Sequence, residues 1–305
     1  TVGGGDVIMQ IGSGIFGVRN EDGTFSWEKF KEKAANPHLR CFEIKLAQGA
    51  KIRGGHVEGS KVNEEIAAIR GVTPWKTVDS PNRHHQFHDI PSLLDFIDEM
   101  RIQGEKPVGI KIVMGGPDSA DELAEAMAKT GRGPDFITVD GGEGGSGATY
   151  QEMADSMGLP INSGLIYCDN ALRKFGVRDK VIIFSSGKLF SPDKIAISLA
   201  SGADLVNIAR GMMISVGCIG AQKCHTNKCP VGVATTDKDH QKALVVDEKK
   251  WRVLNYMVTL RNGLHTLAAA AGIESYNAFT RNHVVYRDQF GKVTSLEEIF
   301  PYPNP

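Results

Sequence analysis

The sequence predicts an α/β protein with the architecture of a (β/α)8 TIM barrel, and two observations support this prediction. The chain has 305 residues, a length suited to one such barrel, for which roughly 250 residues are typical. Along most of the chain, short apolar segments that end in Gly or polar residues alternate with helical patterns, as expected for successive βα units. No linker-like tract divides the chain, so we expect one domain over residues 1–305.

The expected strands are as apolar as a parallel sheet requires when helices cover it. About six of the eight strands of a barrel can be recognised, and the chain begins at Thr1 without a Met. We therefore expect a barrel that lacks its first strand or strands. The expected strands span residues 42–47, 76–80, 108–114, 135–140, 180–185 and 204–208, of which 76–80 has the weakest pattern.

Two helical patterns between these strands predict crossover helices. Residues 92–102 place their apolar side chains on one helical face. Residues 119–130 open with Ser119-x-x-Glu122, the sequence of a capping box, in which each side chain bonds a free backbone N–H of the other residue. We expect both helices to cover the outer face of the sheet.

Two further helices are expected in the C-terminal half. Ser191 and Pro192 mark an N-cap and the first helical position, and Gly202 follows the end of the same apolar run. A long apolar periodicity over residues 247–271 predicts a helix on the outside of the main body. It forms part of an expected C-terminal helical extension, residues 245–305.

Composition and charge exclude several classes of protein. Lys plus Arg (35) nearly balance Asp plus Glu (36), leaving a net charge of -1, so no global positive field is present to hold nucleic acid. The longest apolar runs fall far short of the roughly 20 residues that cross a membrane, and the first residues do not resemble a signal peptide. Five cysteines, an odd number, favour a reducing compartment, and we expect a cytoplasmic protein.

Three cysteines, Cys218, Cys224 and Cys229, lie within twelve positions and give the strongest chemical signal in the sequence. Three thiols in a glycine-containing loop, residues 217–231, can surround one soft metal centre, and three thiolates without a fourth suggest a three-iron cluster. A zinc site that adds His225 is the first alternative, although adjacent ligands fit the usual zinc spacing poorly. Three unrelated buried thiols are the second alternative. Cys41 and Cys168 are expected to be core thiols.

Two neighbouring segments near the cysteines predict a phosphate site. One expected strand ends in Ser186-Gly187 and the next in Ala209-Arg210-Gly211. In α/β barrels a phosphate commonly lies between the loops after strands 7 and 8, where small residues leave backbone N–H groups accessible. We therefore expect a phosphorylated cofactor beside the cysteine segment.

Charged and glycine-rich positions at other strand ends indicate a ligand. Lys45 and Lys111 lie inside apolar strands, where a cation requires a nearby carboxylate or a ligand anion. Glu43 shares a strand face with Lys45, so an ion pair between them is the structural alternative. Residues 140–148 contain five glycines, including Gly141, and would let the backbone approach a flat ligand, or would form a mobile surface loop.

Several of these segments together resemble the FMN-binding synthase domain of glutamate synthases. The resemblance runs through nearly the whole chain and is closest to the stand-alone FMN-binding glutamate synthase-like proteins. Its most specific part is the spacing of the cysteines. The segments that carry it are Lys45-Leu-Ala-Gln-Gly-Ala-Lys51 and residues 9–14, 79–81, 140–145, 209–211 and 218–231.

The resemblance implies an FMN-containing (β/α)8 barrel with a 3Fe-4S cluster on Cys218, Cys224 and Cys229. The implied reaction is that of an oxidoreductase acting on CH-NH2 groups, which reduces the 2-iminoglutarate formed from 2-oxoglutarate and ammonia to L-glutamate. The resemblance implies an electron donor such as ferredoxin or an NAD(P)H-dependent reductase subunit. It also implies ammonia from another subunit or domain, or from glutamine through a separate glutaminase.

The resemblance also implies roles for individual residues. Lys45 would face the N1/O2 region of the flavin and stabilise the negative charge of the reduced ring. Gln48 and Lys51 would hold the carboxylates of the 2-oxo acid. The other residues expected to bind the cofactor are Lys111, Gly141 and, through their backbones at the phosphate, Ser186, Gly187, Ala209, Arg210 and Gly211.

Two departures from the family pattern suggest alternatives. The loop over residues 52–56 differs from the family and is apparently one residue shorter, so the substrate could be another 2-oxo or imino acid. The sequence predicts neither a glutaminase nor a reductase domain, so an electron-transfer subunit without its own substrate is a further alternative, and this chain alone could be an inactive fragment.

Overall fold

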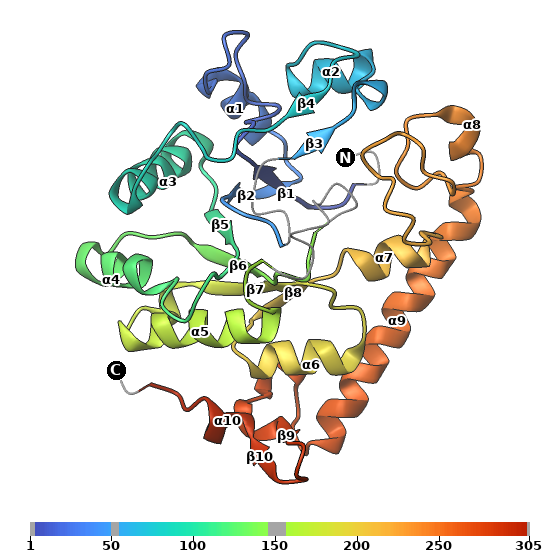
Figure 1. Ribbon diagram of the computed structural model, residues 1–305. Helices are drawn as coiled ribbons and strands as arrows, with labels where there is room; N and C mark the ends of the chain where they lie inside the picture. Colours follow the sequence, from blue (N-terminus) through green and yellow to red (C-terminus); the bar gives the residue numbers. More distant parts are fainter. Residues whose placement is uncertain (1–3, 50–54, 146–156, 304–305) are drawn as a thin grey trace.

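The structure is a computed structural model that describes residues 4–49, 55–145 and 157–303. Within these residues the centre of the protein is one curved sheet of six parallel strands, seen in Figure 1. Every neighbouring pair is parallel. In spatial order the strands are β1 (Val7–Ile11), β2 (Leu39–Lys45), β5 (Val108–Ile112), β6 (Phe136–Asp140), β7 (Ile182–Ser186) and β8 (Leu205–Asn207).

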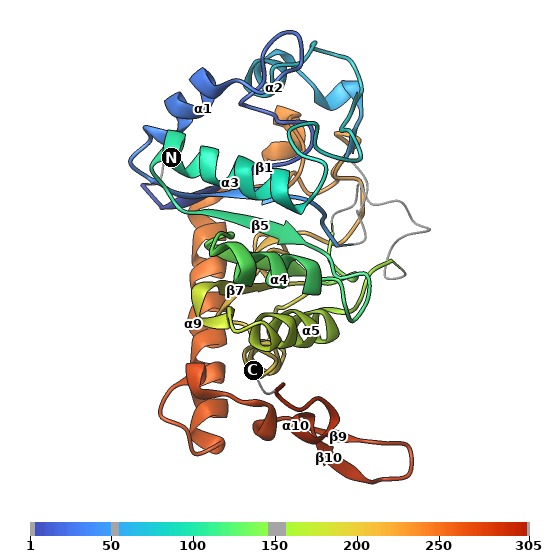
Figure 2. The same ribbon diagram turned by 90° about the vertical axis from the view of Figure 1, so that its left-hand side faces the viewer.

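Helices alternate with the strands and form an outer layer around the sheet (Figures 1 and 2). Among the described residues β1 and β8 are not paired with each other, so the sheet is a parallel half-barrel. This confirms the predicted α/β architecture. The outer helices are α1 (Trp27–Ala34), α3 (Ile90–Gly104), α4 (Asp121–Thr130), α5 (Ile161–Lys174) and α6 (Pro192–Ala200).

The two faces of the strands differ, because side chains alternate between them. One face packs on the helices and holds the main core, with Phe30 of α1 against Phe42 of β2 at a ring distance of 4.3 Å. The opposite face carries polar residues toward the inside of the half-barrel. The core residues of the central strands include Phe42, Ile44, Val108, Ile110, Ile137, Val139 and Ile183, which are all nearly fully buried.

Five of the six predicted strands belong to this sheet, and the sixth, predicted at residues 76–80, does not. There the strand is short, β4 (Val78–Asp79), and it pairs antiparallel with β3 (His56–Val57) in a separate two-stranded sheet. The sixth strand of the main sheet is β1, whose residues are mostly exposed and have little apolar patterning.

The capping box predicted at Ser119 is also wrong. Helix α4 begins later, and its N-cap is Ala120, which has no side-chain hydrogen bond. The Ser119 hydroxyl accepts hydrogen bonds from the backbone N–H groups of Gly115 and Gly116 instead, at 3.0 and 2.8 Å.

The predicted termini of the helix that follows Ser191 are confirmed, and the helix predicted over residues 92–102 extends two residues further at each end, as α3. Ser191 is the N-cap of α6, Pro192 is its first residue and Gly202 follows its end with a φ of +115°. Helix α9 (Val246–Ala270) runs along the outside of the body (Figure 1). It packs on α6 through Leu260 and Leu264. None of the described helices is long and apolar enough to cross a membrane.

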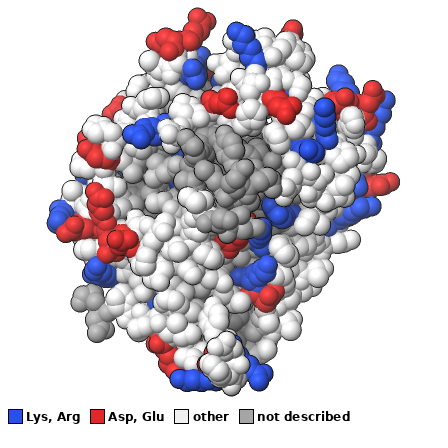
Figure 3. Space-filling model, in the orientation of Figure 1, with Lys and Arg blue, Asp and Glu red and all other residues white. Residues whose placement is uncertain are grey.

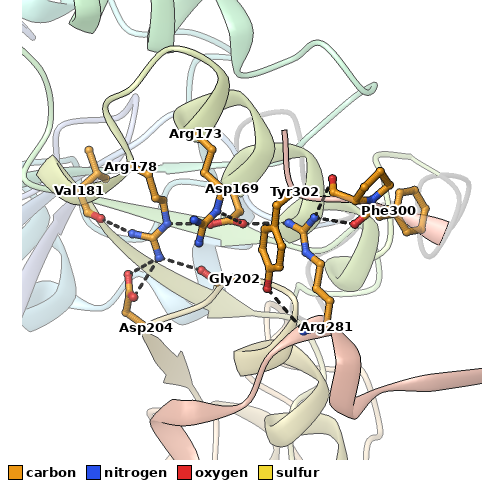
Figure 4. Close-up of polar contacts among 10 residues, drawn as sticks. Asp169, Arg173, Arg178, Val181, Gly202, Asp204, Arg281, Phe300 and Tyr302 are labelled. Atoms are coloured by element: carbon orange, nitrogen blue, oxygen red, sulfur yellow. Dashed lines mark hydrogen bonds and ion pairs between the residues drawn. The ribbon is translucent and has the colours of Figure 1, made fainter. Parts of the chain in front are cut away.

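The C-terminal segment returns to the body of the protein through a buried ionic network, shown in Figure 4. Asp169 of α5 is fully buried and accepts hydrogen bonds from Arg173, Arg178 and Arg281, each at 2.8 Å. Arg281 is also fully buried, and its guanidinium carbon lies 4.2 Å from the ring centroid of Tyr302. The network therefore fastens this segment to α5. The remaining C-terminal elements are α7 (Arg210–Ser215), α8 (Lys238–Gln241), β9 (Val285–Arg287), β10 (Val293–Ser295) and α10 (Leu296–Ile299).

Candidate active site and cysteine cavity

Polar side chains face the inside of the half-barrel where β2, β5 and β6 end. Lys45 and Lys111 are register partners on neighbouring parallel strands, so they lie side by side. Lys111 is nearly buried, and its Nζ lies 3.1 Å from Oδ2 of the buried Asp140. The carboxylate offsets the cost of burying this ammonium. Glu43, on the same face, accepts hydrogen bonds from the Gln10 amide and the Thr138 hydroxyl.

Lys45 lies beside a cavity of about 220 Å³ at this end of the sheet. Its Nζ donates to Oε1 of Gln48 at 3.3 Å. Arg70, at the end of α2 (Glu64–Arg70), brings a second cation to the wall. Two cations and several amide groups suit a small anionic ligand. The polar residues of the lining are Gln10, Ser13, Lys45, Gln48, Arg70, Ser80 and Asn82.

The three cysteines of the predicted cluster loop line one second cavity, of about 510 Å³. Gln48 lines this cavity as well as the first, so it lies between the two. Ala209 and Arg210, from one of the predicted phosphate turns, also face the cysteine cavity. The structure therefore brings together three groups of residues that the sequence singled out separately.

The thiols are not arranged around one point. Among the described residues, no group of three or more His, Cys, Asp or Glu side chains is placed to hold a single metal ion. A tetrahedral zinc requires its sulfur ligands to converge within about 2.3 Å of the metal. The geometry therefore does not fit the Cys3His zinc site that includes His225.

The chemistry of the thiols differs between the cavity and the core. Burial raises the pKa of Cys229, but hydrogen bonds from four backbone N–H groups of residues 231–234 outweigh this effect, and the pKa lies below its ordinary value. Gly220 N–H donates to Cys218 Sγ at 3.5 Å. In contrast, burial raises the pKa of Cys168 to about 12 and also raises that of Cys41. The thiolate form is therefore favoured at Cys229 and disfavoured at Cys41 and Cys168.

The two predicted phosphate turns follow neighbouring parallel strands. Ser186 of β7 pairs in register with Asn207 of β8, so both turns leave the same edge of the sheet, as expected. A Cβ on Gly211 would lie 2.1 Å from the Tyr256 hydroxyl of α9, so a larger residue here would require the Tyr256 side chain to move. Gly187 has a φ of +148°, a backbone conformation that residues with a side chain rarely adopt.

The described part of the glycine-rich loop is held in place. The Gly141 N–H donates to the Ser186 carbonyl at 2.8 Å, which ties this loop to the end of β7. The Glu143 carboxylate accepts from the N–H of Ile161, the first residue of α5, at 3.0 and 3.1 Å. This part of the loop is therefore not the mobile surface loop of the alternative interpretation. Residues 146–148, like Lys51 and residues 52–54, lie outside the described residues.

Three residues of the site were missed by sequence reasoning. His84 is buried and donates through Nε2 to the backbone carbonyl of Lys45 at 3.0 Å. Burial lowers the pKa of His84, so it is a neutral donor at neutral pH. Lys61 contacts the cysteine segment, and Arg70 lines the first cavity. No local pattern marks these residues, because their partners are distant in the sequence.

Acidic and basic side chains are interspersed over the described residues on the face seen in Figure 3. No broad basic patch is visible among them there. This agrees with the near-zero net charge of -1.

The comparison with protein families shows to which family the chain belongs. A family model described as the conserved region in glutamate synthase matches residues 2–274. The chain belongs to the glutamate synthase family. This confirms the resemblance predicted from the sequence and places the chain in a family of oxidoreductases.

Individual relatives agree with this assignment. The glutamate synthase large subunit-like protein YerD of Bacillus subtilis is 57% identical over 297 residues, covering 97% of this chain and 57% of that protein. The archaeal glutamate synthase [NADPH] of Methanocaldococcus jannaschii is 31% identical, covering 90% of this chain and 51% of that protein. This glutamate synthase-type chain thus spans about half the length of these curated relatives.

Solved structures similar to this glutamate synthase-type chain are distant. A mandelate oxidase variant with an FMN adduct covers 91% of this chain and 62% of its own, with a TM-score of 0.47 and 15% identity. An inosine 5′-monophosphate dehydrogenase from Legionella pneumophila covers 94% of this chain and 74% of its own, with a TM-score of 0.45 and 16% identity.

Proposed function

We propose that this chain provides the FMN and iron–sulfur centre of a glutamate synthase, which reduces 2-iminoglutarate, formed from 2-oxoglutarate and ammonia, to L-glutamate. The observation that carries the proposal is the position of Gln48 between the polar cavity and the cysteine cavity. An electron-transferring cluster must lie close to the cofactor that it serves. Membership in the glutamate synthase family supports the same reaction.

The residues present fit FMN. Small-residue turns leave β7 and β8 at one edge of the sheet, and Ala209 and Arg210 of the second turn line the cysteine cavity. In the proposal the backbones of Ser186, Gly187, Ala209, Arg210 and Gly211 hold the phosphate. Bound FMN supplies hydride transfer, and the protein supplies orientation and charge.

Cations at the cavity suit a reduced flavin and a dicarboxylate. Lys45, oriented by Gln48 and by the hydrogen bond from His84 to its carbonyl, stabilises negative charge on the reduced ring. Two further residues complete the proposed flavin site. They are Lys111, whose charge is partly neutralised by Asp140, and Gly141. Gln48 and Lys51 bind the carboxylates of the 2-oxo acid.

The cysteine cavity fits a 3Fe-4S cluster better than zinc. Its three thiols line one cavity. In a three-iron cluster each thiolate binds a different iron. Backbone N–H groups favour the thiolate of Cys229, which is the form that binds iron. The cluster would supply single electrons from a donor such as ferredoxin or an NAD(P)H-dependent reductase subunit.

A second candidate function is the reduction of another 2-oxo or imino acid. Gly55 and Val57, at the described end of the altered loop, line the first cavity beside Lys45. A change in the sequence of that loop therefore alters the lining of the proposed substrate cavity. The presence of this polar cavity argues against an electron-transfer subunit without its own substrate.

The test uses protein purified anaerobically, loaded with FMN and reduced with dithionite. We expect L-glutamate to form from 2-oxoglutarate and ammonia, measured by chromatography. Turnover of a different 2-oxo acid, with none of 2-oxoglutarate, would favour the second candidate. If the protein binds FMN but none of the 2-oxo acids tested, with ammonia, reoxidises the reduced FMN, both candidates would be overturned.

We expect Lys51→Met to raise the KM for 2-oxoglutarate in the FMN-loaded protein, because the variant loses an ammonium that pairs with a substrate carboxylate. The loss is roughly 2 to 5 kcal/mol if the pair is desolvated and hydrogen-bonded. The FMN content should not change. Steady-state kinetics measure the effect, with Lys76→Met, a change at an exposed lysine, as the matched control. An unchanged KM would assign Lys51 to a solvated loop, and lost FMN would assign it to the cofactor.

A further inference from the structure

A short turn far from the cysteines in sequence lies directly against them. The turn is the 3-10 helix η1 (Gly59–Lys61), which follows the β3 strand beside the first cavity. It contacts the segment of residues 224–234 through backbone and side-chain hydrogen bonds. These are Glu58 N–H to His225 O at 3.2 Å, Ser60 Oγ to Thr226 O at 3.4 Å and Asn227 Nδ2 to Ser60 O at 3.4 Å.

Lys61 makes the strongest of these contacts. Its half-buried ammonium donates to the backbone carbonyl of Cys224 and to that of Ala234, the latter at 2.8 Å. These two carbonyls lie on either side of Cys229 in the chain. Charge-assisted hydrogen bonds are roughly twice as strong as neutral ones, so a single side chain closes the loop that carries two of the three thiols.

The electrostatic position of Lys61 differs from that of the other lysines in this region. Burial lowers the pKa of its ammonium and Cys224 raises it, with weaker effects from Arg70, which lowers it, and Cys229, which raises it. Lys228 lies next to Cys229 in sequence but is exposed, so solvent screens its charge. Lys61 therefore acts on the cysteine cavity from inside the protein and Lys228 from outside.

We propose that Lys61 is a positioning residue of the cysteine cavity, which fixes the Cys224–Ala234 loop and places a positive charge beside the thiolates of Cys224 and Cys229. The second part rests on the proposed function, because it concerns a cluster bound by these thiolates. Reduction adds negative charge to a cluster, and a nearby half-buried cation favours the reduced form. Lys61 thus raises the reduction potential and helps the cluster to accept an electron from its donor.

The first measurement uses the iron-free chain and does not depend on the cluster. In Lys61→Met we expect amide hydrogen exchange over residues 224–234 to become roughly 10-fold faster, because two hydrogen bonds are lost. Lys228→Met, the matched control, should exchange like the wild type. Unchanged exchange in Lys61→Met would overturn the loop-fixing role, whether or not the protein holds a cluster.

The second measurement uses the anaerobically purified, cluster-loaded protein. In Lys61→Met we expect iron release to a ferrous chelator to become about 10-fold faster, as for other substitutions next to metal ligands, and the midpoint potential of the cluster to become more negative. Lys61→Arg keeps the charge, so it should restore most of the potential. Lys228→Met should change neither property.

The outcomes separate this proposal from the proposed function. Wild-type protein without iron, or with zinc alone, would overturn the cluster and leave the hydrogen-exchange result to decide on Lys61. Wild-type protein with a cluster, but with the same potential in Lys61→Met and the wild type, would overturn the electrostatic role. A lowered potential that Lys61→Arg does not restore would assign the effect to the loop geometry and overturn the charge.

Discussion

Replacing Asp169 by Asn is expected to lower the free energy of unfolding by about 3 to 5 kcal/mol, the usual cost of breaking a buried ion pair from one side. Asp169 is the fully buried acceptor for Arg173, Arg178 and Arg281, and Arg281 is itself fully buried. Burial lowers the pKa of Arg281, and the Asp169 carboxylate opposes this effect. In the variant the buried guanidinium loses this negative partner. The C-terminal segment should detach from α5 first.

Urea denaturation followed by circular dichroism measures this loss. Asp247→Asn is the matched control, since Asp247 pairs with Lys250 at 2.7 Å on the exposed surface. Exposed pairs contribute about 0 to 1 kcal/mol, so the control should stay close to the wild type. A loss in Asp169→Asn no larger than in the control would show that the arginines find other partners.

The largest effect on the cysteine cavity is expected from Cys224→Ser. Anaerobically purified wild-type protein should contain iron and acid-labile sulfide, and the variant should lose nearly all of both. A serine hydroxyl remains protonated at neutral pH and is a poor ligand for the iron of a sulfide cluster, which prefers thiolate. Iron and sulfide assays together with the visible absorption spectrum measure the loss.

Cys41→Ser is the control for this experiment. Cys41 is half-buried on β2, outside the cysteine cavity, and burial raises its pKa, so it is a neutral thiol. The control should keep its iron. Stoichiometric zinc without iron in the wild type would contradict the cluster, and retained iron in Cys224→Ser would remove Cys224 from its ligands.

Strands could be predicted where their own residues carry the signal. Strands β2, β5, β6, β7 and β8 are short apolar segments whose outward face packs on helices, and local patterning reveals them. Strand β1 lies at the edge of the described sheet with mostly exposed residues, and its pairing with β2 is what makes it a strand. The segment at residues 76–80 has only one apolar residue, Val78, and its short strand pairs with β3 instead of the main sheet.

The candidate site was predictable to a similar extent. Cys218, Cys224 and Cys229 lie close in sequence, so their convergence on one cavity could be expected. The partner of Lys111 could be expected only as a carboxylate of unknown position, and the structure identifies it as Asp140. His84 carried no signal at all.

The sequence by itself determined the order of βα units, the ends of α6 and the cysteine loop. Each of these depends on residues within a few positions of one another, where periodicity and capping act. Only the tertiary structure decided that Gln48 lies between the two cavities, that Lys61 closes the cysteine loop and that Arg281 reaches Asp169. Such contacts join residues far apart along the chain, and they form only when the packed core brings their elements together, which no local pattern records.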